Sequence, residues 1–78
     1  LNLFNSAFVL QVAGLLQTRL EREAGPGNTD RIRLAFELCF GREPNPEEAK
    51  ESQGLVSKHG LHVLCRALFN SNEFVFIP

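Results

Sequence analysis

The sequence predicts an all-α fold, a small bundle of about four helices followed by an apolar C-terminal tail. In most of the chain, apolar residues recur every three or four positions, the spacing of one buried helix face. Glycine, proline and asparagine divide this pattern into four segments. The 78 residues, 44% of them hydrophobic, suffice for one small domain. We therefore expect residues 1–78 to form a single helical domain or C-terminal subdomain excised from a longer chain.

The first predicted helix runs from Ser6 to Glu23. Asn5 or Ser6 is expected to cap its start, because a short polar side chain can accept from the free N–H groups of the first turn. Gly14, in the middle of the helix, indicates a close helix–helix contact. The expected buried face consists of Phe8, Val9, Val12, Ala13, Leu16 and Leu20.

The second predicted helix runs from about Thr29 to Phe40, after a breaker rich in glycine and proline. Asn28 or Thr29 is expected to cap it. Arg33 and Glu37 are four residues apart, which is the spacing of an ion pair on one helix face. The apolar face is wide, so this helix is predicted to be central in the core.

The segment that follows predicts the junction to a third helix. Gly41 suits the left-handed position just past a helix end, and Asn45 followed by Pro46 suits an N-cap and a first helical residue. The third helix is predicted from Pro46 to about Lys58. It contains few apolar residues, so we expect it to be the most exposed and the least stable.

The fourth predicted helix runs from about Leu61 to Phe69, and a polar cluster follows it. This cluster echoes the start of the chain, because Leu3–Val9 and Leu68–Val75 share an order of apolar, Asn-Ser and apolar residues. Three interpretations remain open: coincidence, one capping arrangement used twice, or two segments that pack side by side and present matched amide groups to a partner. The candidate partner-contact residues are Asn70, Ser71, Asn72, Glu73 and Phe74, with Phe4, Asn5 and Ser6 beside them.

Composition and motifs argue against several kinds of chemistry. A net charge of −1 and a pI of about 6.1 argue against phosphate-neutralising nucleic-acid binding. No apolar run is long enough for a transmembrane segment. We expect no catalytic residue and no cofactor. We also expect no metal site, because His59, His62 and the two cysteines lack a paired ligand spacing. Cys39 and Cys65 fall on apolar helix faces, and both a disulfide and two buried thiols fit the sequence.

Several short motifs follow one another along the chain: Leu3-Phe4-Asn5-Ser6, Phe8-Val9, Arg31-Ile32, Ala35-Phe36, Phe40-Gly41-Arg42 with Pro44 and Glu47-Glu48, and Leu64 to Phe74. Their order resembles the C-terminal end of a domain of unknown function from planctomycetes. That domain terminates large exported proteins that often also carry cytochrome c and cytochrome-associated domains. The resemblance therefore implies an exported or periplasmic parent protein, much longer than this segment, in which haem domains are possible. It implies no catalytic residue.

The leading functional hypothesis is a non-catalytic structural or protein-interaction module at the C-terminus of such a parent protein. Its partner would be the remainder of the parent chain or another protein. The alternative is the C-terminal part of an enzyme or redox domain whose active site lies mostly upstream. A third hypothesis is a helical adaptor related to linker repeats, which use a similar Gly-Arg-x-Pro junction between helices.

Overall fold

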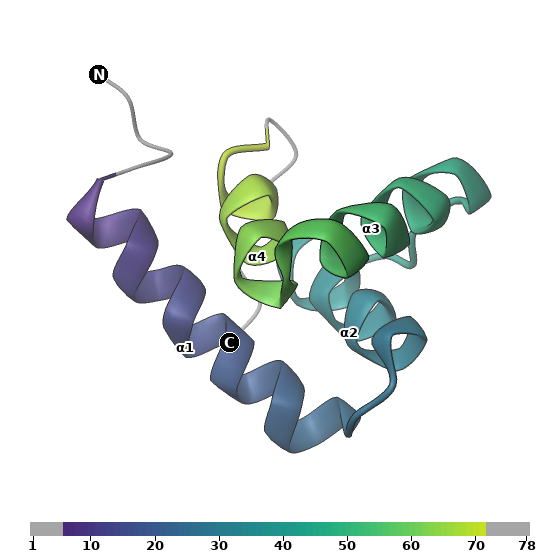
Figure 1. The fold of residues 1–78 in the computed structure, drawn as a ribbon, viewed down its shortest axis with the longest axis horizontal. Coiled ribbons are helices and arrows are strands. Elements are labelled where there is room, and N and C mark those ends of the chain that lie inside the picture. The colour runs from purple at the N-terminus through teal and green to yellow at the C-terminus, as the bar shows by residue number, and fades with distance from the viewer. Residues whose placement is uncertain (1–5, 72–78) are drawn as a thin grey trace.

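The computed structural model describes residues 6–71, and within this range it contains four helices and no strand. The all-α prediction and the number of helices are therefore confirmed (Figure 1). The predicted apolar C-terminal tail lies outside the described residues. The helices are α1 (Ala7–Ala24), α2 (Asn28–Phe40), α3 (Pro46–His59) and α4 (Leu61–Phe69).

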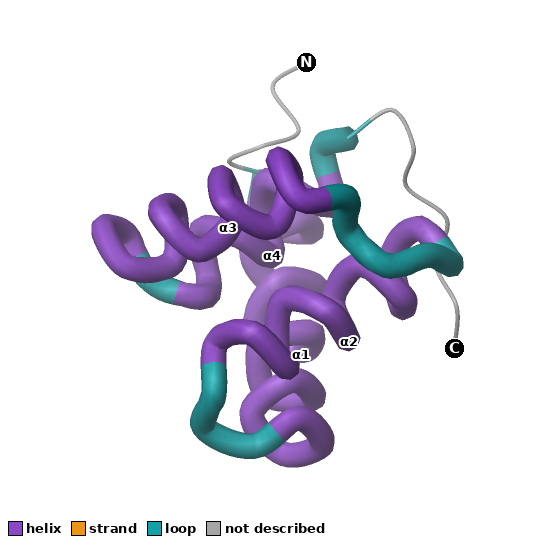
Figure 2. Tube along the Cα trace, turned by 90° about the vertical axis from the view of Figure 1, so that its right-hand side faces the viewer, coloured by secondary structure: helices purple, strands orange, loops and turns teal. Residues whose placement is uncertain are grey.

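The shortest helix, α4, holds the bundle together. It lies between α1 and α3 and also contacts α2 (Figure 1). Among the described helices, α1 and α3 are the one pair that do not contact each other. The connections are short (Figure 2): residues 25–27 join α1 to α2, residues 41–45 join α2 to α3, and Gly60 alone joins α3 to α4. Such short connections leave each helix few alternative positions.

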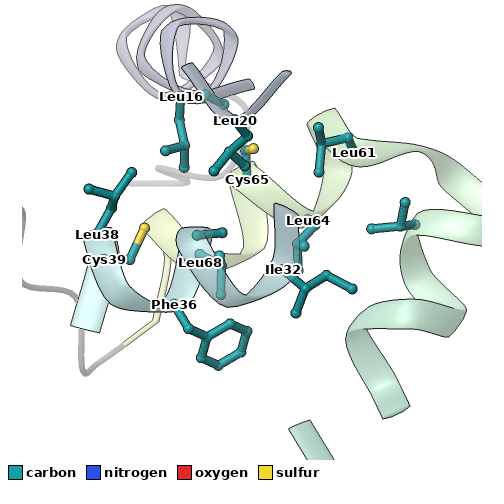
Figure 3. Close-up of a cluster of buried hydrophobic side chains, with 13 residues drawn as sticks. Leu16, Leu20, Ile32, Phe36, Leu38, Cys39, Leu61, Leu64, Cys65 and Leu68 are labelled. Atoms are coloured by element: carbon teal, nitrogen blue, oxygen red, sulfur yellow. The ribbon is translucent and has the colours of Figure 1, made fainter. Parts of the chain in front are cut away.

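A single apolar core lies where α4 meets the other helices (Figure 3). The second helix contacts all three others, as expected for a central helix, and α4 does so as well. The least exposed large side chains come from α1, α2 and α4: Leu20, Ile32, Cys39 and Cys65. From α3, the buried residues are only Val56 and Ser52, in line with the apolar-poor pattern predicted for this helix.

Several predicted helix ends are confirmed. The Ser6 side chain accepts a hydrogen bond from the backbone N–H of Val9 at 3.1 Å and so caps α1. Gly41 has φ 71° and ψ 19°, the left-handed conformation expected after α2. Asn45 caps α3 and Pro46 is its first residue. Each of these positions has a backbone requirement that only a few residue types meet.

The predicted cap of α2 is wrong. The N-cap is Gly27, which has no side chain to accept a bond, and Asn28 is already the first helical residue. The Thr29 hydroxyl instead accepts a hydrogen bond from Gln53 Nε2 at 3.0 Å and so joins α2 to α3. The loop is closed by Arg31, whose Nε donates to the carbonyl of Gly25 at 2.6 Å.

Two further expectations are wrong. Gly14 makes no close helix contact, because a Cβ built there would meet no atom within 4 Å outside its own helix backbone. Arg33 does not pair with Glu37. Its guanidinium lies 3.0 Å from Glu43 and 3.8 Å from Asp30, because the turn after α2 brings Glu43 back alongside this helix.

The junction between α2 and α3 is fixed by an ion pair that also caps a helix. Arg42 donates two hydrogen bonds to the Glu48 carboxylate, at 2.8 and 2.9 Å. Glu48 also accepts from the backbone N–H of Asn45 at 2.9 Å, while Asn45 Oδ1 accepts from the Glu48 N–H at 2.8 Å. This reciprocal pair is a capping box. The Arg42 guanidinium also lies 5.8 and 5.5 Å from the ring centroids of Phe36 and Phe40, so the junction is attached to the core.

This arrangement predicts a pH-dependent loss of stability. The Arg42 guanidinium, and then the Asn45 N–H, hold the pKa of Glu48 at about 2, below its ordinary value of 4.5. A lowered pKa in the folded state contributes stability above pH 4.5, and this is lost as the pH falls towards 2. Because both side chains are about one-third exposed, we expect a contribution of about 1 kcal/mol rather than the full effect of the shift.

Two substitutions separate the charge from the cap. Glu48→Gln removes the ion pair but can still accept from the Asn45 N–H, and it should lower the free energy of unfolding by about 1 kcal/mol at pH 7. Glu48→Ala removes both interactions and should cost about 2 kcal/mol. Urea unfolding at pH 7 and pH 3 measures both effects, with Glu47→Gln in the same helical turn as the control. If the Glu48→Gln variant loses as much stability between pH 7 and pH 3 as the unsubstituted chain, the pH dependence does not come from Glu48.

Candidate interaction surface

Large apolar side chains are exposed on α1. Phe8 is 72% exposed, Leu15 67% and Leu10 40%, and these are the exposed large hydrophobic residues in the described part of the chain. Phe8, Val12 and Leu15 follow one another at steps of four and three residues, so they share one side of the helix. We call these three residues the α1 stripe. Val12, in the middle of the stripe, is half-buried. Large apolar side chains exposed on one side of a helix are a feature of protein contact sites.

The expectation that Phe8 belongs to the core is therefore wrong. The buried face of α1 consists of Val9, Ala13, Leu16 and Leu20. Phe8 is rotated by about 100° from Val9 around the helix axis, which places it at the edge of the apolar arc. Apolar residues cover a wider arc of α1 than α4 and α2 bury. This excess width is the signal in the sequence from which a second apolar face could have been inferred.

The α1 stripe borders a groove of about 130 Å³. Leu15 and Val12 line one wall, and Phe69, the last residue of α4, lines the other. The groove is largely apolar, with Arg19 at one edge. Arg19 is itself paired with Glu23 at 3.0 Å. We call this feature the α1/α4 groove; its lining residues are Val12, Leu15, Leu16, Arg19 and Phe69.

Three of the eight predicted contact residues lie in the described part of the chain. Ser6 is the N-cap of α1. Asn70 is the C-cap of α4, and its side-chain amide donates to the Arg66 carbonyl at 2.8 Å. The Ser71 N–H donates to the Leu68 carbonyl at 3.1 Å. The other five, Phe4, Asn5, Asn72, Glu73 and Phe74, lie outside the described residues.

Only part of the echo between the two ends of the chain lies in the described residues. Ser6 begins a helix, whereas Asn70 ends one. Residues 3–5 and 72–75 of the two copies lie outside the described part of the chain. What connects the second copy to the α1 stripe is position, because Asn70 and Ser71 directly follow Phe69 in the wall of the α1/α4 groove.

Both cysteines are free, buried thiols (Figure 3). Burial raises the pKa of the Cys39 thiol to about 11. Burial, with a smaller contribution from Cys39, raises that of Cys65 to about 12. The thiolate is the reactive form of cysteine, and a raised pKa leaves little of it. Both side chains therefore act as small apolar residues of the core.

The histidines do not lie together with the cysteines as a ligand set. His59 is the exposed last residue of α3, and His62 is a half-buried residue in the first turn of α4. Within residues 6–71, no three His, Cys, Asp or Glu side chains are grouped so that they could hold a metal ion. In the same range, no helix combines the length and the apolar character that a membrane span requires.

Comparison with known proteins adds no relative: no family model, no curated protein and no solved structure matches this sequence.

The burial of the two thiols predicts slow alkylation. At pH 8, native Cys39 should react with iodoacetamide at least about a hundredfold more slowly than in the chain unfolded in guanidinium, because a pKa of about 11 leaves little thiolate. Intact mass against time measures the rate, and the unfolded chain is the control. Rapid labelling of the native chain, or a starting mass lower by two hydrogen atoms, would contradict buried free thiols.

Proposed function

We propose that this chain is a non-catalytic structural and protein-interaction module at the C-terminus of a larger exported, cytochrome-associated protein. The observation that carries the contact role is the α1 stripe, because Phe8 and Leu15 are two-thirds or more exposed on a helix whose opposite side is fully used by the core. Apolar residues at steps of four and three along a helix are the pattern with which a helix docks into an apolar surface.

The proposed partner is the remainder of the parent chain or another protein. Its contact surface should be apolar, since the α1 stripe offers no charged group between Phe8 and Leu15 on that side. The turn Asn70–Phe74, with the segment Phe4–Ser6, is proposed to extend the contact. Asn70 and Ser71 support this extension by their position after Phe69, which shares the groove wall with the stripe.

The location and the other domains of the parent protein are proposed from the sequence resemblance, not from the exposed stripe. The exported or periplasmic location, the haem domains of the parent and the C-terminal placement rest on the resemblance of the motifs. The Gly41-Arg42 to Pro44 motif among them has a structural role in the described chain, because Arg42 holds the junction between α2 and α3.

A binding experiment tests the contact role. The chain and the remainder of the parent protein are produced as two polypeptides, and their association is measured by titration calorimetry. Phe8→Ser should weaken association at least about tenfold, as truncation of a central apolar contact does. It should change the free energy of unfolding of the chain alone by less than about 0.5 kcal/mol, because Phe8 is exposed.

Gln11→Ser is the matched control, since Gln11 is an exposed residue of the same helix and is polar. It should change neither association nor stability. Association that is unchanged by Phe8→Ser would show that the α1 stripe is not the contact. If association were unchanged while a catalytic activity of the parent fell, the alternative of an enzyme or redox domain would be favoured instead.

A further inference from the structure

A second groove lies between α3 and α4. It has a volume of about 310 Å³, and no residue of α1 lines it. The helices α1 and α3 do not contact each other, so this groove and the α1 stripe are separate surfaces of the molecule. We call this feature the α3/α4 groove; its described lining residues are Phe36, Glu48, Glu51, Ser52, Leu55, Leu64, Ala67 and Leu68.

Most of the lining of the α3/α4 groove is apolar. Phe36, Leu64 and Leu68 are buried residues of the core and form its floor. Leu55 from α3 and Ala67 from α4 are half-buried and line its two sides. A large apolar side chain inserted between them would contact methyl groups and an aromatic ring. The groove is open to solvent, which suits a peptide better than a small molecule, because small-molecule pockets bury most of their ligand.

The charged residues that line the groove are both acidic, and both belong to α3. The Glu48 carboxylate is already paired with Arg42. Glu51 is exposed and forms no ion pair within residues 6–71. Its own helix supplies no cation at the neighbouring positions three and four residues away, which are Glu47, Glu48, Gly54 and Leu55. The carboxylate of Glu51 is therefore available to a cation of a partner.

Ser52 adds a buried polar group to the same groove. It is 6% exposed and is the one buried polar residue in residues 6–71. Its hydroxyl forms no hydrogen bond with another described residue, and it lines the groove rather than being enclosed in the core. Buried hydroxyl groups normally have a hydrogen-bond partner. This hydroxyl can donate to a backbone carbonyl of a bound peptide.

We propose that the α3/α4 groove binds a peptide segment of a partner protein in which a large apolar side chain stands next to a lysine or arginine. The apolar side chain packs on Phe36 and Leu64, between Leu55 and Ala67. The cation pairs with Glu51, and the Ser52 hydroxyl donates to the backbone of the segment. This site goes beyond the proposed function, because it gives the chain a second contact surface and so allows it to join two partners.

Selection from a library of short random peptides displayed on phage tests the charge preference. The immobilised 78-residue chain should enrich peptides with a large apolar residue beside lysine or arginine. A Glu51→Lys chain, selected in parallel, should enrich aspartate or glutamate at that place instead, because the charge at the edge of the groove is reversed. Glu37→Lys is the matched control, since Glu37 is exposed on α2, does not line the groove and changes the net charge equally. It should enrich the same peptides as the unsubstituted chain.

The Kd of one enriched basic peptide, measured by fluorescence polarisation, tests the individual residues. It should rise at least about tenfold on Glu51→Lys and less than about twofold on Glu37→Lys. Ser52→Ala should raise it about three- to tenfold. The same substitution should not lower the folding equilibrium constant, because the hydroxyl has no described partner in the free chain and alanine favours the helix. A less stable Ser52→Ala chain would overturn the role of Ser52 in the site.

Phe8→Ser separates this groove from the α1 stripe. It should leave the Kd of the basic peptide unchanged, because Phe8 does not line the α3/α4 groove. A Kd that rises on Phe8→Ser but not on Glu51→Lys would assign the peptide to the stripe and overturn the proposal. Enrichment of the same peptides by the unsubstituted and Glu51→Lys chains would also overturn it. If the Glu51→Lys chain fails to fold, Glu51→Gln serves in its place and should abolish the preference for basic residues.

Discussion

The structure depends on the burial of α4, a helix of nine residues. So short a helix is not stable alone in water, because the entropy cost of forming its first turn exceeds the stabilisation from the hydrogen bonds of about two turns. Its start also has no side-chain cap, since Gly60 precedes it. What stabilises α4 is the apolar face that it places between α1, α2 and α3. In return, it gives α1 and α3, which do not contact each other, a common core.

The elements that the sequence predicted well are those with local causes. Gly41, Asn45 and Pro46 each meet a backbone requirement within one or two residues, so their roles could be inferred without the fold. The periodicity of α1, α2 and α4 identified the helices for the same reason. The Arg42–Glu48 pair was not predicted, because it depends on how the turn between α2 and α3 folds back over six residues.

The errors concern contacts between elements. Thr29 was expected to cap its own helix, but its hydroxyl bonds to Gln53, 24 residues away. Arg33 was matched with Glu37 by spacing, whereas the fold brings Glu43 closer. Phe8 was assigned to the core because the apolar arc of α1 was taken as one face. For the candidate site, the sequence pointed to the polar turn at Asn70 but not to the exposed apolar stripe, since periodicity alone does not say how much of an arc the neighbours bury.

The pairing of the first helix with the last one also affects how the chain forms during synthesis. The buried face of α1 leaves the ribosome first, but the helix that covers much of it, α4, is made about forty residues later. At ordinary translation speed that interval lasts a few seconds. During this time Leu16 and Leu20 have only the earlier partner α2 available. The nascent chain is therefore most open to wrong association shortly before α4 emerges, and a chaperone that shields α1 would act in that interval.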